Sequence, residues 1–257
     1  MVGKLMLQSS ALLLALCPTI NASPKDEFHR TIQTVKRSIA AVACLQKESD
    51  RNVSIASIEG TGFFISRDGV FLTAGHIAHG LYLGSPPRQK ACEIPAIYVP
   101  KKRWGKTKET NVEIELRWFK IDRCVYDDNL DLAKCKLVQN PFTSPDVTKK
   151  PLIADFDTSL PEEGTSIAFT GFPLNTFQPV TARAEIGSYR VAPNEAAPSE
   201  VVVDHSNGPG ASGAPIYLSN GKVVGIVLKR GLKNEAYGLV FSSRTAFMKS
   251  SAGDYFR

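Results

Sequence analysis

The stretch GFFISRDGVFLTA, residues 62–74, decides the fold class. Two apolar runs flank Arg67-Asp68-Gly69, and an Asp-Gly pair between apolar runs is a strong β-hairpin signal because both residues tolerate a positive φ. A second hairpin of the same kind is predicted later in the chain, where residues 214–218 and 222–228 flank Asn220-Gly221. Since the two hairpins lie far apart in sequence, we expect two separate β units.

Length and composition are those of a folded globular protein. The chain has 257 residues, enough for one large domain or two small ones, with 43% hydrophobic and 22% charged residues. Disordered, collagen-like and coiled-coil chains are therefore disfavoured. The net charge of +6, from 31 basic and 25 acidic residues, is well short of the dense basic face of a nucleic-acid-binding protein. We therefore expect no nucleic-acid partner.

Short helices are expected only near the two ends of the chain. Apolar residues recur at Phe28, Ile32, Val35 and Ile39, which is the spacing of an amphipathic helix lying on a sheet. Residues 243–256 are expected to form a short closing helix.

Between these helices the sequence consists of short β-rich runs separated by turns. Residues 141–161 contain several prolines and little apolar periodicity, so they are expected to link the two β units. Many short strands with a central linker favour an all-β fold of two antiparallel β-barrels packed together. The expected barrels cover about residues 36–140 and about residues 162–245.

The first 22 residues have the pattern of a signal peptide. Lys4 precedes an apolar stretch at residues 11–17, and the break at Pro18 and the small residue Ala22 follow. The apolar stretch is shorter than the about 20 residues that span a bilayer, and no later stretch comes close. We therefore expect residues 23–257 to be a soluble chain without a membrane span, secreted to the periplasm or the extracellular space.

Four cysteines follow the predicted signal peptide, and an even number in an exported chain predicts two disulfides. Three pairings are possible. Because Cys124 and Cys135 bracket a short loop between two strand-like runs, we favour that pair, with Cys44 bonded to Cys92. Four buried free thiols are the alternative. The chain has neither a Cys-x-x-Cys nor a His-Glu-x-x-His motif, so we expect no metal site.

A glycine-rich turn, Gly210-Ala211-Ser212-Gly213-Ala214-Pro215, is the strongest chemical signal. A nucleophilic serine needs a hydroxyl presented from a tight turn, with backbone N–H groups free to face a developing oxyanion, and glycine permits that geometry. His76 ends the first predicted hairpin, and Asp131 begins a strand-like run after an acidic loop. Serine, histidine and aspartate are the residue types of a catalytic triad, whose imidazole takes and returns a proton near neutral pH.

These motifs resemble the chymotrypsin-like serine proteases, and most closely the exported bacterial HtrA-type branch. The resemblance implies two six-stranded antiparallel β-barrels and a secreted serine endopeptidase that acts on proteins or peptides without a metal or organic cofactor. The residues after 245 are too few for the PDZ domain that HtrA-type relatives commonly carry, so none is expected. The matching segments occur in the family's order: residues 60–65, 72–76, 131–133, 171–173, 210–215 and 223–226.

The resemblance also assigns roles to residues. It makes Ser212 the nucleophile, His76 the general base, and Asp131 the residue that orients the imidazole. The backbone N–H groups of Gly210 and Ser212 would form the oxyanion hole. With no carboxylate at its base, the substrate pocket would leave a Lys or Arg side chain unpaired, so we expect a small or medium uncharged residue before the scissile bond. The pocket residues are Ser206, Asn207, Gly208 and Gly238.

Departures from the family pattern leave other functions open. Ala211 stands where trypsin has an aspartate that pairs with a newly cut N-terminus, so activation by that ion pair is excluded. Leu228 stands where many relatives offer a hydroxyl to the catalytic aspartate, and Ala214 replaces a common glycine. These changes motivate an alternative, a catalytically weak or inactive trypsin-fold binding protein. A third possibility is cleavage of esters by the same triad.

Other polar residues near these motifs are given structural roles. His79 is expected to be structural, and Asp127 and Asp128 to belong to a solvated loop. Residues 101–108 carry five positive charges and one aromatic residue, which suits either a solvated loop or a segment that binds a polyanion. The sequence indicates neither the oligomeric state nor the physiological substrate.

Overall fold

The computed structural model describes residues 24–49, 52–84, 91–100, 116–128, 130–191, 200–204, 209–230 and 236–240. Its helices are α1 Pro24–Val35, α2 Gly75–Leu83 and the 3-10 helix η1 Pro173–Asn175. The first six strands are β1 Ile39–Lys47, β2 Val53–Phe64, β3 Val70–Ala74, β4 Ile94–Pro100, β5 Leu116–Asp127 and β6 Leu132–Leu137. The other six are β7 Ser166–Gly171, β8 Val180–Arg190, β9 Glu200–Val203, β10 Pro215–Leu218, β11 Val223–Arg230 and β12 Ala236–Val240.

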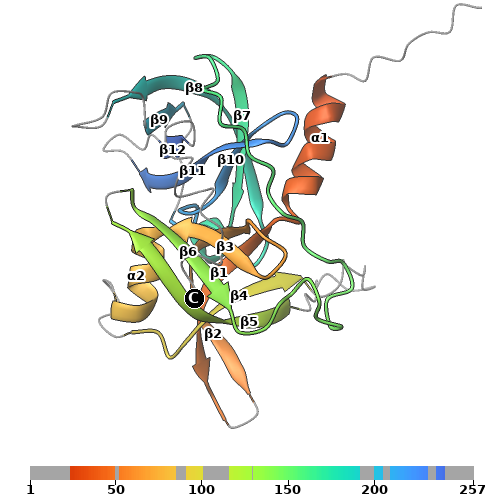
Figure 1. Ribbon diagram of the computed structural model, residues 1–257, viewed down its shortest axis with the longest axis vertical. Helices are drawn as coiled ribbons and strands as arrows, with labels where there is room; N and C mark the ends of the chain where they lie inside the picture. The colour runs from red at the N-terminus through yellow and green to blue at the C-terminus, as the bar shows by residue number, and fades with distance from the viewer. Residues whose placement is uncertain are drawn as a thin grey trace, which may run out of the picture.

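The strands form two closed barrels that lie one above the other in Figure 1. The lower barrel has the order β1-β2-β3-β6-β5-β4, and the upper barrel has the order β10-β11-β12-β9-β8-β7. Every neighbouring pair recorded within the barrels is antiparallel. The expected all-β fold of two six-stranded barrels is confirmed.

Both predicted hairpins are present, and glycine makes each turn. Gly69 (φ +82°) lies between β2 and β3, and Gly221 (φ +87°) lies between β10 and β11. The second turn is closed by a bond from the Gly221 N–H to the Leu218 carbonyl, 2.9 Å long. Each backbone is in the left-handed region, which glycine enters without steric cost.

Helix α1 packs on the upper barrel, beside β7 and β10 in Figure 1. Its Phe28 ring is buried and lies 6.3 Å from the ring of Tyr217, and the Arg183 guanidinium lies 4.7 Å from the centre of the Phe28 ring. The apolar spacing predicts that the helix includes Ile39, and this prediction is wrong. The helix ends at Val35, and Ile39 instead starts β1, because its backbone pairs with Phe63 of β2.

The segment between the barrels bonds to both of them. The Ala154 N–H donates to the Phe64 carbonyl of the lower barrel over 2.9 Å. Three residues later, the Asp157 N–H donates to the Val223 carbonyl of the upper barrel, also over 2.9 Å. Residues 141–161 therefore cross the junction and are hydrogen-bonded to both barrels, which ties the two together.

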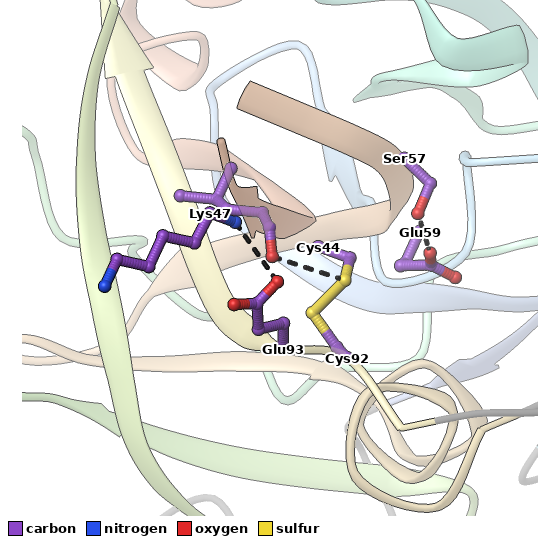
Figure 2. The surroundings of a disulfide bond; sticks show 7 residues. Cys44, Lys47, Ser57, Glu59, Cys92 and Glu93 are labelled. Carbon is purple, nitrogen blue, oxygen red and sulfur yellow. Dashed lines mark hydrogen bonds between the residues drawn. A yellow bond between two sulfur atoms is a disulfide. The ribbon is translucent and has the colours of Figure 1, made fainter. Parts of the chain in front are cut away.

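Two disulfides brace the lower barrel, and their pairing is the one that the sequence analysis favoured. Cys44 of β1 is bonded to Cys92, just before β4, and beside that bond the Lys47 N–H donates to the Glu93 carboxylate (Figure 2). The other disulfide joins directly opposed residues of β5 and β6, Cys124 and Cys135. The chain-entropy model assigns such bridges, across separations of 48 and 11 residues, about 4 and about 3 kcal/mol of stability.

Lys134 of β6 makes the stability of this barrel sensitive to pH. Its side chain is fully buried, and burial lowers the pKa of its amine from 10.5 to about 8. Between these two values the unfolded chain binds more protons than the folded one, so the free energy of unfolding rises with pH. Relative to Lys134→Met, the wild type should gain up to about 3 kcal/mol between pH 7 and pH 10.5 in urea denaturation. A constant difference between the two proteins across this range would contradict the prediction.

Several predicted features lie outside the described residues. They are the signal peptide at 1–22, the basic run at 101–108 and the closing helix at 243–256. Among the helices that are described, none has the length and apolar character needed to cross a membrane.

Candidate active site

His76 stands at the start of α2, directly after β3 brings the chain to the junction of the barrels. The residue before the helix, Ala74, has no side chain that can cap it. The carboxylate of Asp131 does so instead, since Oδ1 accepts the His76 backbone N–H over 2.7 Å. The other oxygen, Oδ2, lies 2.7 Å from Nδ1 of the His76 ring. One carboxylate therefore caps the helix and contacts the imidazole that the helix carries.

Asp131 is held in an unusual backbone conformation by the loop between β5 and β6. Its φ is +51°, in the left-handed region that aspartate tolerates better than most residues. The Asp131 carbonyl accepts the Gly75 N–H over 2.7 Å. A Cβ at Gly75 would lie 2.9 Å from the Asp131 carbonyl carbon, so the glycine leaves room for this close approach. The disulfide between Cys124 and Cys135 crosslinks the two strands that carry the loop.

Ser212 lies in a turn whose flanking glycines have positive φ, +92° at Gly210 and +84° at Gly213. A Cβ at Gly210 would lie 2.3 Å from the Phe172 carbonyl oxygen, and one at Gly213 would lie 1.9 Å from the Thr61 carbonyl oxygen. No side chain fits at either place. The turn therefore packs backbone against backbone, which explains why glycine is needed on both sides of the serine.

The Ser212 hydroxyl has its hydrogen bond with β11. Oγ donates to the Leu228 carbonyl over 3.2 Å, and this carbonyl is its hydrogen-bond partner among the described residues. The His76 ring bonds to Asp131 and has no recorded bond to Ser212. The side chains of His76 and Asp131 are 44% and 21% exposed, so solvent and substrate reach the pair. The three predicted residues thus form one bonded pair and a serine that bonds elsewhere.

Two backbone N–H groups of the serine turn are available for a ligand. Within the described part of the chain, no oxygen accepts from the N–H of Gly210 or of Ser212. In a trans peptide the N–H points away from the preceding carbonyl. The Pro209 carbonyl accepts the Leu174 N–H over 2.6 Å, and the Ala211 carbonyl accepts the Ala214 N–H over 2.9 Å. These bonds restrain the direction of the two N–H groups.

A second histidine–aspartate pair lies one helical turn further along α2. His79 Nε2 is 2.8 Å from Asp128 Oδ1, and the His79 ring stacks on Tyr126 with 4.2 Å between ring centres. Asp128 is exposed, as expected of a solvated loop, and it also ties that loop to α2. Asp127 accepts the Leu130 N–H within the same loop. Sequence spacing alone could not pair residues that lie so far apart in the chain.

Most of the predicted substrate pocket lies outside the described residues, namely Ser206, Asn207 and Gly208. Gly238 lies in β12, between Val227 of β11 and Val201 of β9. In the part of the chain that is described, no three His, Cys, Asp or Glu residues gather as a metal site would need.

Sequence analysis assigned no role to Thr61, although it lies within a matching segment. Its side chain is fully buried, and its backbone N–H donates to the Ser212 carbonyl over 2.8 Å. Its hydroxyl donates to the Gly210 carbonyl over 2.9 Å. A buried threonine leaves no recognisable pattern in a single sequence, so only the folded chain reveals this contact.

The comparisons with known proteins agree with this fold. Among solved structures, Rv3671c from M. tuberculosis H37Rv, a serine-to-alanine mutant in its inactive form, matches with a TM-score of 0.58 and 16% identity over 88% of this chain and 92% of that chain. The HtrA-type protease AlgW with decapeptide matches with a TM-score of 0.63 and 14% identity, over 87% of this chain and 66% of that one, just under two thirds. No curated protein matches the sequence.

The family comparison covers well over half of the chain, from Gly60 in β2 to Ile226 in β11. The model that matches residues 60–226 describes the trypsin-like peptidase domain. Parts of both barrels and all three predicted site residues fall within the matched range. The chain belongs to the family of trypsin-like peptidase domains.

Proposed function

We propose that the protein is a secreted serine endopeptidase, which cleaves peptide bonds through Ser212, His76 and Asp131 and an acyl-enzyme intermediate. One observation carries the proposal: the 2.7 Å contact between His76 Nδ1 and the Asp131 carboxylate, in a chain of the trypsin-like peptidase family. An inactive binding protein would have no comparable task for such a pair. An esterase would use the same pair, so the preference for peptides over esters has to come from experiment.

The contact with Asp131 fixes the tautomer of the imidazole. An ionised carboxylate can only accept a hydrogen bond, so the proton of neutral His76 resides on Nδ1. Nε2 then carries a lone pair, which is what a general base needs. Asp131 cannot turn away easily, because its other oxygen is bonded to the His76 backbone N–H.

The reaction that we propose follows from these roles. The Ser212 hydroxyl turns from the Leu228 carbonyl toward His76, and its proton passes to Nε2 as Oγ bonds to the substrate carbonyl carbon. The N–H groups of Gly210 and Ser212 stabilise the resulting oxyanion. The imidazolium then returns the proton to the leaving amine as the peptide bond breaks. Water repeats the sequence on the acyl-enzyme and releases the acid.

We propose that Ser206, Asn207, Gly208 and Gly238 line the pocket for the residue before the scissile bond, and that this residue is uncharged. None of the four residues carries a carboxylate that could form an ion pair with a buried cation. The two disulfides support export, since such bonds persist in oxidising compartments. We therefore place the mature chain in the periplasm or outside the cell.

Labelling by a fluorophosphonate probe tests this function directly. We expect the probe to attach to the mature wild-type protein, because only an activated serine displaces its leaving group. Labelling should disappear in Ser212→Ala and persist in Ser159→Ala, which alters an exposed serine between the barrels. A peptide library and a set of p-nitrophenyl esters would then separate peptide from ester cleavage. A folded wild type that takes up no probe would overturn the proposal and favour the binding protein.

A further inference from the structure

Thr61 of β2 lies where the lower barrel meets the serine turn of the upper barrel, and every polar group of this residue is bonded. Its N–H donates to the Ser212 carbonyl over 2.8 Å. Its hydroxyl donates to the Gly210 carbonyl over 2.9 Å and accepts the Phe172 N–H over 3.0 Å. Its carbonyl accepts the Thr73 hydroxyl over 2.7 Å.

The surroundings of Thr61 are built for close approach. A Cβ at Gly171 would lie 2.7 Å from the Thr61 hydroxyl oxygen, and one at Gly213 would lie 1.9 Å from the Thr61 carbonyl oxygen. A Cβ at Gly60 would lie 2.9 Å from the Ser212 carbonyl oxygen. Three glycines thus let backbone segments of both barrels reach one buried threonine. Valine has nearly the same shape as threonine, so the hydrogen bonds of the hydroxyl are what distinguish threonine at this place.

Gly210 explains why a hydroxyl matters there. Glycine rotates more freely than any other residue, so the N–H that would face an oxyanion is the one most free to turn away. The peptide before Gly210 is held by the Leu174 N–H on the Pro209 carbonyl. The peptide after Gly210 is held by the Thr61 hydroxyl on the Gly210 carbonyl. Both peptides that flank Gly210 are therefore restrained, one of them by a side chain of the other barrel.

Thr61 also connects the two halves of the site. Thr73, which donates to its carbonyl, lies three residues before His76 on the same strand and helix junction. A path of hydrogen bonds consequently runs from the strand before His76, through Thr61, to the carbonyls of Gly210 and Ser212. Thr61 and Thr73 are fully buried, so the part of this path that belongs to the lower barrel is shielded from water.

We propose that Thr61 is a positioning residue, whose hydroxyl fixes the peptide after Gly210 and so holds the Gly210 N–H in the direction needed to stabilise the oxyanion. This inference rests on the proposed function. In Thr61→Val a methyl group replaces the hydroxyl, and the Gly210 carbonyl and the Phe172 N–H both lose their partner. Gly210 is then restrained on one side alone, by the bond from the Leu174 N–H to the Pro209 carbonyl, so its N–H is held less firmly and transition-state stabilisation falls while the substrate pocket is unchanged.

Steady-state kinetics with a peptide substrate test the inference. Because a lost oxyanion donor costs roughly 10²- to 10³-fold in kcat, we expect a misdirected one in Thr61→Val to lower kcat roughly 10- to 100-fold with KM little changed. The affinity for a peptide boronic acid, which forms a tetrahedral adduct with an active-site serine, should fall by a similar factor. Thr61→Ser keeps the hydroxyl and should restore most of both values. Should Thr61→Val not fold, Thr61→Ala removes the same hydroxyl without adding a methyl group.

Thr170→Val is the matched control. Thr170 is also fully buried, and its hydroxyl bonds to Thr181 and Tyr217 rather than to the serine turn. We expect this variant to lose stability but to keep kcat. A kcat in Thr61→Val equal to that of Thr170→Val, or no recovery in Thr61→Ser, would overturn the inference. Inactivity of the wild type itself would instead overturn the proposed function, so the two failures are distinguishable.

Discussion

Ser212→Ala is expected to lower kcat for peptide cleavage about 10⁶-fold, and His76→Ala by a similar factor. The serine supplies the attacking oxygen and the imidazole accepts its proton, so each is useless in this step without the other. The double variant should therefore be no slower than either single variant. The test is the steady-state kcat of the two single variants and the double variant on a peptide chosen from the library, at matched concentrations of folded protein.

The control for this prediction is His79→Ala, one turn further along α2. His79 bonds to Asp128 and stacks on Tyr126, so its loss should affect stability more than turnover. If the kcat of the double variant fell by the product of the two single losses, Ser212 and His76 would act in separate steps. Loss of activity in His79→Ala equal to that in His76→Ala would show that the wrong histidine has been given the catalytic role.

Asp131→Asn should lower kcat about 10⁴-fold while the fold stays intact. Oδ1 accepts a backbone N–H, so the amide oxygen of asparagine takes its place and the amide NH₂ faces Nδ1 of His76. The ring must then accept at Nδ1 and carry its proton on Nε2. An imidazole in that tautomer cannot take the proton of Ser212. Kinetics together with the NMR signals of the His76 ring would check both the rate and the tautomer.

Asp128→Asn is the matched control, because it makes the same chemical change in the other pair that joins this loop to α2. Asp128 is 79% exposed, so we expect only a small change in rate and stability. In Asp131→Asn the amide oxygen still caps the helix, so we expect a thermal unfolding temperature close to that of the wild type. Such a result would show that the loss of kcat does not come from a folding defect. A kcat within tenfold of wild type in Asp131→Asn would remove Asp131 from the proposed triad.

The hairpins and barrels were predictable from sequence because local rules determine them. Asp68-Gly69 and Asn220-Gly221 need positive φ at glycine, and the alternation of short apolar runs with turns is visible in the letters themselves. The end of α1 was not predictable. Ile39 fits the helical spacing, and its pairing with Phe63 of β2 prevails over that spacing.

The candidate site divides in the same way. Residue types and motif order pointed to His76, Asp131 and Ser212, and the contact between the first two is present. The bond from Ser212 to the Leu228 carbonyl and the contacts of Thr61 were not foreseen, because both involve backbone carbonyls. Every residue has such a carbonyl, so no pattern of side chains marks the ones that matter. Pairing His79 with Asp128 likewise required knowing how α2 lies against the loop.

The position of α1 has a consequence for the order in which the chain is made. This helix precedes the first barrel in sequence, yet Phe28 packs on Tyr217 and the Thr31 hydroxyl donates to the Ser219 carbonyl, 188 residues away. During synthesis from the N-terminus, the earliest ordered helix thus waits for nearly the latest strand before its apolar face is covered. The upper barrel therefore gains the contacts of α1 only after β10 has been made and has reached the helix.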